Sequence, residues 1–191
     1  MRFNGVIPPL ITPFTESGAV DFKAHQRNVR RWNESALAGY LVLGSNSEAV
    51  HLSEAEKLEL IEGTAAAAAP GRLLMAGTGM DSTAETIRLT RLAAERGARA
   101  ALILTPYYYG GRMNDAALIR HFEQVAEAST IPILIYNVPK YTGVNVSLRV
   151  VETLSCHPNI VGMKDSSGNI AQLVQFQEAA AEDFQVLVGT A

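Results

Sequence analysis

The sequence holds almost no cysteine and no excess of positive charge. Cys156 is the only cysteine among 191 residues, which excludes a disulfide within the chain and fits a reducing compartment. We expect its side chain to pack at a helix end. The formal net charge is −3 and the basic residues are scattered, so no nucleic-acid partner is predicted. The four histidines lie far apart and lack ligand spacing, so no metal site is predicted either.

Long apolar runs are also missing. No segment reaches the length of a transmembrane helix, and an apparent strand begins within a few residues of Met1. Neither membrane association nor a leader peptide is therefore predicted. Hydrophobic residues make up 48% and charged residues 18%, which is typical of a globular protein and argues against disorder. We expect a soluble cytoplasmic protein.

Short apolar runs alternate with amphipathic segments along the whole chain. The amphipathic segments carry helix signals: capping boxes at Ser53-x-x-Glu56 and Ser82-x-x-Glu85, and an apolar face at Leu118, Phe122 and Val125. Continuous apolar strands between helices predict a parallel sheet with both faces covered. The expected strands are Val6–Ile11, Tyr40–Leu43, Leu73–Gly77, Ala100–Leu104, Ile133–Tyr136, Ile160–Lys164 and Val186–Gly189.

Polar or unusual residues follow nearly every expected strand, and their distribution selects the fold. A barrel collects its chemistry from the carboxyl ends of many strands. A dinucleotide-binding sheet would instead place G-x-G-x-x-G after its first strand, where this chain has none. The residues in question are Thr12-Pro13, Gly44-Ser45-Asn46, Gly77-Thr78-Gly79, Thr105-Pro106-Tyr107-Tyr108, Tyr136-Asn137 and Lys164-Asp165. We predict an α/β fold, a (β/α)8 TIM barrel.

The number of expected strands falls short of a closed barrel. A barrel needs eight strands and about 250 residues, whereas the sequence ends at Gly189-Thr190-Ala191, just beyond the seventh. We therefore expect residues 1–191 to form a single partial TIM-barrel domain, truncated after strand 7. Its open strand edges would favour association with other chains.

Lys164 closes an apolar strand and has two interpretations. An amine at the end of a buried strand is poorly hydrated, and a neutral amine can attack a carbonyl to form a Schiff base. Alternatively, its stem packs on the strand while its head reaches water. Tyr136 ends the preceding apolar strand, where a phenol can shuttle protons for such a reaction. Its alternative is an ordinary core tyrosine with a hydrated hydroxyl.

The segment GSNSE at 44–48 offers backbone amides, a hydroxyl and a carboxamide. We expect it to begin a helix, where an anionic carboxylate is stabilised. The alternative is a plain turn that enters the helix without binding anything.

Five segments in order resemble a known family. They are Thr12-Pro13-Phe14, GSNSE, TPYYY at 105–109, YNVP at 136–139 and GMKDSSGN at 162–169. They look like the pyruvate-dependent class I aldolases, which include dihydrodipicolinate synthase, N-acetylneuraminate lyase and 4-hydroxy-2-oxoglutarate aldolase. The resemblance runs from residue 3 to residue 191. It implies that Lys164 is the Schiff-base lysine, that Tyr136 is the proton shuttle, and that no organic cofactor or metal takes part.

The same resemblance implies the remaining site residues. Ser45 and Asn46 match positions that bind the carboxylate of a 2-oxo acid such as pyruvate, and Ser45 would also relay protons. Thr12 and Tyr141 complete the predicted substrate-binding set. Tyr108 matches a catalytic tyrosine that reaches into the site of a neighbouring subunit, which implies a homo-oligomer, either a dimer or a tetramer.

The choice of family member depends on two segments. Dihydrodipicolinate synthases usually carry two threonines and a glycine where this chain has Ser45, Asn46 and Ser47. They also carry an arginine where this chain has Tyr141, beside Lys140. The segments TPYYYGGRM, HPNIVGMKDSSG and DFQVLVGTA look most like 4-hydroxy-2-oxoglutarate aldolase, so we predict cleavage of that substrate to pyruvate and glyoxylate.

Two alternatives remain open. Within the family, the alternative is dihydrodipicolinate synthase, which condenses pyruvate with aspartate semialdehyde. The alternative of another class is an inactive barrel fragment that acts as a binding or oligomerisation module.

Overall fold

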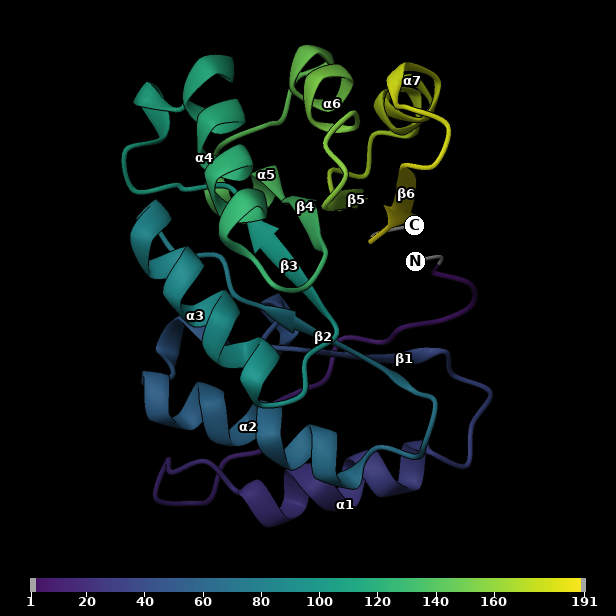
Figure 1. The fold of residues 1–191 in the computed structure, drawn as a ribbon. Coiled ribbons are helices and arrows are strands. Elements are labelled where there is room, and N and C mark those ends of the chain that lie inside the picture. The colour runs from purple at the N-terminus through teal and green to yellow at the C-terminus, as the bar shows by residue number, and fades with distance from the viewer. Residues whose placement is uncertain (1–2, 190–191) are drawn as a thin grey trace. The chain divides into compact units, whose positions relative to one another are not determined.

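The computed structural model describes residues 3–189, so the last two residues of the DFQVLVGTA segment lie outside the described part (Figure 1). Within it the chain forms two compact units. The N-terminal unit comprises residues 3–77 and 92–101, and the C-terminal unit comprises residues 78–91 and those from 102 onward. The prediction of a single domain over residues 1–191 stays a prediction.

Helices and strands alternate as the apolar pattern predicts. Hydrogen bonding orders the strands β1-β2-β3-β4-β5-β6, and the pairs β1–β2, β4–β5 and β5–β6 are parallel. The elements are α1 (Phe22–Trp32), β1 (Gly39–Val42), η1 (Ser45–Ser47), η2 (Ala49–His51), α2 (Glu54–Ala67), β2 (Leu73–Gly77), α3 (Thr83–Glu95), β3 (Ala100–Leu104), η3 (Gly110–Arg112), α4 (Asp115–Ala128), β4 (Ile133–Asn137), α5 (Pro139–Thr142), α6 (Leu148–Leu154), β5 (Ile160–Asp165), α7 (Ile170–Ala179) and β6 (Gln185–Val188).

The first expected strand, Val6–Ile11, is wrong as a regular strand. It forms one isolated parallel bridge, between Pro9 and Leu41 of β1. The segment still runs beside β1, because Leu41 N donates to Pro8 O over 3.0 Å and Leu10 N donates to Leu41 O over 2.8 Å. Two consecutive prolines have no N–H to donate, so the ladder cannot extend. The described residues therefore contain six strands instead of the expected seven.

The starts of α2, in the N-terminal unit, and of α3, in the C-terminal unit, both follow the predicted caps. Ser53 and Glu56 form the complete capping box of α2, with each side chain satisfying the other residue's backbone N–H. At the second predicted box, Ser82 Oγ accepts from Glu85 N over 3.1 Å, while the Glu85 carboxylate pairs with Arg88. Of the two hydrogen bonds of a capping box, the start of α3 therefore shows the one that the serine accepts.

In the C-terminal unit, the predicted apolar face of α4 is confirmed, since Leu118, Phe122 and Val125 are fully buried. The packing predicted for Cys156 is wrong, because the residue is exposed beyond the end of α6. Among residues 3–189, no helix is long and apolar enough to cross a membrane.

His121 of α4 is a buried base in the C-terminal unit. Its Nδ1 lies 2.9 Å from Thr83 Oγ1, and its ring meets Phe122 edge-to-face at 5.2 Å. Its Nε2 is buried and has no hydrogen-bond partner. Burial disfavours the imidazolium and lowers the pKa of His121 to about 4.

This buried histidine predicts a pH dependence of stability. The unfolded chain binds a proton at His121 below its ordinary pKa of 6.5, while the folded chain stays neutral down to about 4. This group should therefore lower the free energy of unfolding by about 3 kcal/mol in total as the pH is reduced from 6.5 to about 4. Urea titrations of wild type and His121→Asn across this range should show a weaker dependence in the variant. If the free energies of unfolding of wild type and variant fall equally as the pH is reduced, the lowered pKa of His121 is contradicted.

Candidate active site

The structure places Tyr136 and Lys164 side by side. Tyr136 is the fourth residue of β4, Lys164 is the fifth of β5, and the two are cross-strand partners. Lys164 Nζ lies 4.5 Å from the centroid of the Tyr136 ring. Tyr136 is buried and Lys164 is half-buried, so the amine stands where the apolar strands give way to polar residues. An amine and a phenol in this arrangement can act on the same bound carbonyl.

Gly189 approaches the lysine stem closely and is not among the site residues predicted from the sequence. Its N–H donates to Asp165 O over 2.7 Å, beyond the end of β6. A Cβ at this position would lie 2.6 Å from Lys164 Cε and would also overlap Ser166 Oγ. Only a residue without a side chain lets the backbone pass this close. The available signal was the glycine that ends the last apolar run, Val186–Gly189.

Asn137 and Asp165 follow the two site residues and were also missed as a pair. Both side chains are buried, and Asn137 Nδ2 donates to Asp165 Oδ1 over 2.7 Å. Ser167 Oγ donates to the other carboxylate oxygen over 2.6 Å. The turn after Lys164 is thus fixed by a buried carboxylate.

The TPYYY segment forms an exposed aromatic turn in the C-terminal unit. Tyr108 is 74% exposed, and its ring meets that of Tyr109 edge-to-face at 5.0 Å. One carboxylate oxygen of Asp81 accepts from the N–H groups of Tyr107 and Tyr108, at 3.0 and 2.9 Å. The turn is therefore anchored through its backbone, while the Tyr108 side chain stays accessible. Its role in a neighbouring subunit remains a prediction.

Tyr141 lies in the short helix α5 and is 66% exposed. Lys140 Nζ lies 5.6 Å from the centroid of the Tyr141 ring. This position therefore combines an exposed ring with a nearby point charge. It lacks the planar fork of donors that an arginine would present to a carboxylate.

The GSNSE segment differs from the expected helix start. Residues 45–47 form the 3-10 turn η1, a second 3-10 turn follows, and α2 begins only at Glu54. Ser45 and Asn46 are exposed on this turn. Residues that cap an α-helix are equally suited to begin a 3-10 turn, which explains why a helix start was wrongly predicted here. The anion site expected at a helix start is thus not built on an α-helix.

Thr12 and Ser47 tie this turn to the neighbouring chain segment within the N-terminal unit. Ser47 Oγ donates to Leu10 O, and Thr12 Oγ1 donates to Ser47 O over 2.7 Å. Both residues are buried. Thr12 therefore contributes directly to the shape of the Ser45-Asn46 turn, and its substrate-binding role stays a prediction. Ser47 uses its hydroxyl to hold the turn.

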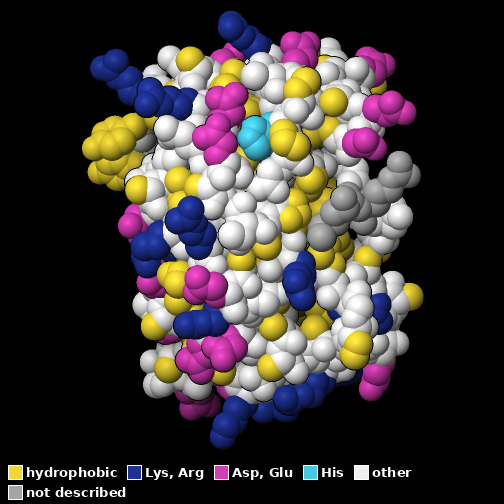
Figure 2. All heavy atoms as spheres, in the orientation of Figure 1, with side chains coloured by type: hydrophobic (Ala, Val, Ile, Leu, Met, Phe, Trp, Pro, Cys, Tyr) yellow, Lys and Arg dark blue, Asp and Glu magenta, His cyan; other side chains and the backbone are white. Residues whose placement is uncertain are grey.

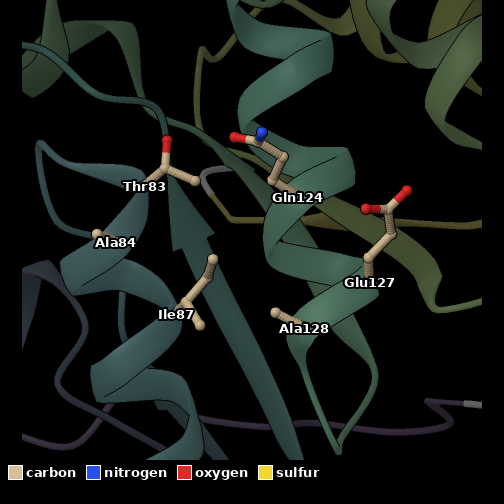
Figure 3. A pocket seen from close by; sticks show the side chains of 6 residues that line it. All are labelled: Thr83, Ala84, Ile87, Gln124, Glu127 and Ala128. Atoms are coloured by element: carbon tan, nitrogen blue, oxygen red, sulfur yellow. The ribbon is translucent and has the colours of Figure 1, made fainter.

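A groove lies between two helices of the C-terminal unit. It is open, has a volume of about 530 Å³ and is lined by Thr83, Ala84 and Ile87 of α3 and Gln124, Glu127 and Ala128 of α4 (Figure 3). None of the predicted site residues lines it. Within residues 3–189, no three His, Cys, Asp or Glu side chains cluster to hold a metal ion. On the face drawn in Figure 2, basic and acidic side chains are interspersed.

Comparison with known proteins identifies the family of the chain. The profile of the Dihydrodipicolinate synthetase family matches residues 2–191. The chain belongs to this family. It is 42% identical over 188 residues to the 4-hydroxy-tetrahydrodipicolinate synthase of Methanococcoides burtonii, covering 98% of this chain and 63% of that protein.

Solved structures confirm the predicted α/β barrel class. Dihydrodipicolinate synthase from Aquifex aeolicus superimposes with a TM-score of 0.92 at 36% identity, covering 98% of this chain and 63% of that one. The Acinetobacter baumannii enzyme, solved in complex with pyruvate, gives a TM-score of 0.91 at 34% identity, covering 97% and 63%. The chain therefore spans less than two thirds of these relatives' length.

Proposed function

We propose that this chain is part of a class I aldolase in which Lys164 forms a Schiff base with the ketone of a 2-oxo acid. The observation that carries this proposal is the pairing of Lys164 with Tyr136, with Nζ 4.5 Å from the ring centroid. The pyruvate present in the Acinetobacter baumannii relative supports a pyruvate moiety in the substrate. No step in this chemistry requires a metal or an organic cofactor.

The reaction can be written with these two residues. The neutral Lys164 amine attacks C2 of the 2-oxo acid, and Tyr136 donates the proton with which the former carbonyl oxygen leaves as water. The protonated imine then accepts the electron pair of the C3–C4 bond as the C4 hydroxyl loses its proton, which releases an aldehyde. The enamine takes up a proton at C3, and hydrolysis frees pyruvate and the lysine.

For the aldehyde, we propose glyoxylate, so that the substrate is 4-hydroxy-2-oxoglutarate. Support comes from the exposed Tyr141, which stands where the synthases resembled by this chain usually carry an arginine. The second candidate is 4-hydroxy-tetrahydrodipicolinate synthase. It is favoured by the names of relatives at 42% identity, and Lys140 could serve as the point charge for the aldehyde's carboxylate.

The candidate of another class is an inactive module that binds ligands or other subunits. Covalent capture of pyruvate separates this candidate from both enzymes.

Borohydride should trap pyruvate on Lys164. Incubating the folded chain with pyruvate and borohydride should add one reduced pyruvate per chain, because reduction makes the imine permanent. Peptide mass spectrometry locates the adduct. Lys164→Arg should abolish it, whereas Lys140→Arg, on a lysine outside the strands, should leave it unchanged. An unmodified but folded chain would contradict the proposed function.

Tyr136→Phe should slow imine formation while leaving pyruvate affinity nearly intact. The variant keeps the ring beside Lys164 but removes the proton donor, so the trapping rate should fall by about 10²- to 10⁴-fold. Measuring the rate against pyruvate concentration separates the maximal rate from the half-saturating concentration. If the maximal rate is unchanged, Tyr136 is not the proton shuttle.

The second substrate can be decided by direct comparison. The chain should release glyoxylate from 4-hydroxy-2-oxoglutarate faster than it consumes aspartate semialdehyde in the presence of pyruvate. Tyr141→Arg should raise the second activity by about tenfold or more, because a guanidinium binds a carboxylate through two hydrogen bonds. Faster use of the semialdehyde by the wild type would favour the synthase.

A further inference from the structure

The pairing of β4 with β5 contains a shift of register near its start. Ile133 pairs with Ile160, but the next pair is Leu134 with Gly162, so β5 carries one additional residue, Val161. Bulges are uncommon in parallel sheets. Every pair that follows, including Tyr136 with Lys164, depends on this extra residue.

Without the shift, the site would not form. Continuing the pairing of Ile133 with Ile160 would set Tyr136 beside Met163 and Asn137 beside Lys164. Because successive side chains point to opposite faces, a slip of one residue also exchanges the faces of a strand. The tyrosine and the lysine would then lie on different faces of the sheet.

The pair Asn137–Asp165 can form in only one of these two registers. In the observed register they are cross-strand partners on the face opposite Tyr136 and Lys164, and Asn137 Nδ2 donates to Asp165 Oδ1 over 2.7 Å. In the slipped register the two side chains would lie on opposite faces, and Asp165 Oδ1 would lose this donor, while Oδ2 keeps the one from Ser167 Oγ. Asp165 is 2% exposed, so a carboxylate oxygen left without its donor there would be unfavourable.

The Asn137 amide is oriented by further contacts. Its Oδ1 accepts from Val146 N over 3.0 Å, and its Nδ2 also donates to Asn145 Oδ1 over 2.9 Å. Asn145 in turn exchanges hydrogen bonds with Gln172 of α7. Since a backbone N–H can only donate and a carboxylate can only accept, the amide has one orientation that satisfies both neighbours.

We propose that Asn137 and Asp165 are positioning residues whose buried hydrogen bond selects the shifted register of β4 and β5, and so sets Tyr136 beside Lys164. Both side chains lie on the face of the sheet opposite the Lys164 amine. Its importance for catalysis rests on the proposed function, whereas its effect on the register does not.

Exchanging the two residues provides a matched test. Asn137→Asp places two carboxylates opposite each other in the observed register, and in the slipped register it places a carboxylate beside Lys164, so it favours the slip. The exchange variant Asn137→Asp/Asp165→Asn restores one amide, one carboxylate and the original net charge. Gln172→Ala, at the outer end of the same network, controls for loss of stability without a change in the pair.

The register can be read without any substrate. The chain has four lysines, Lys23, Lys57, Lys140 and Lys164, so a ¹³C-lysine NMR spectrum is simple and Lys164→Arg assigns its signal. The Tyr136 ring, 4.5 Å from Nζ, should displace the Lys164 ε-CH₂ resonance. Lys140 beside the Tyr141 ring is the internal reference, because that contact lies outside the strands.

In Asn137→Asp, the displaced Lys164 signal should return toward that of an exposed lysine, and pyruvate trapping should slow by about tenfold or more. The exchange variant should restore both, and Gln172→Ala should change neither.

An unchanged Lys164 signal in folded Asn137→Asp, or no recovery in the exchange variant, would overturn the proposal. If Asn137→Asp does not fold, the exchange variant alone decides. If the Lys164 resonances change as expected but the wild-type chain traps no pyruvate, the effect of the pair on the register stands and the proposed function is rejected.

Discussion

The pairing of β4 with β5 is the constraint on which the candidate site depends. The amine and the phenol are contributed by separate strands, and only backbone hydrogen bonding between those strands brings the side chains together. Neither residue selects the other, because a contact between an amine and a ring is weak at a partly exposed position. The geometry is therefore decided by the sheet and by the buried polar groups behind it.

Buried polar groups are used differently in the two units. In the C-terminal unit they connect strands, as Asn137 and Asp165 do, while the aromatic turn at Tyr107 and Tyr108 is anchored by the exposed carboxylate of Asp81. In the N-terminal unit, hydroxyls of Thr12 and Ser47 close a turn onto backbone carbonyls. The two turns thus obtain their shape from side-chain hydrogen bonds that replace those of a helix or strand.

The sequence predicted the strands well where burial alone defines them. The segments Leu73–Gly77 and Ala100–Leu104 were located to the residue, because a continuous apolar run has one simple explanation in a parallel sheet. The first strand failed since two prolines remove the donors that regular pairing needs. The register shift at Val161 was not predictable, because the apolar run reads the same with or without an extra residue. The Asn137–Asp165 pair was missed for the same reason: only the register makes the two residues neighbours.

The close approach of Gly189 to Lys164 links two positions 25 residues apart in the sequence. Any side chain at 189 would compete with the lysine stem for the same volume, so the two positions behave as one unit under substitution. Libraries that vary residue 189 would mostly sample displaced or misdirected lysines. Engineering of new substrate preference in this scaffold should therefore leave this glycine fixed and introduce diversity on the exposed turns.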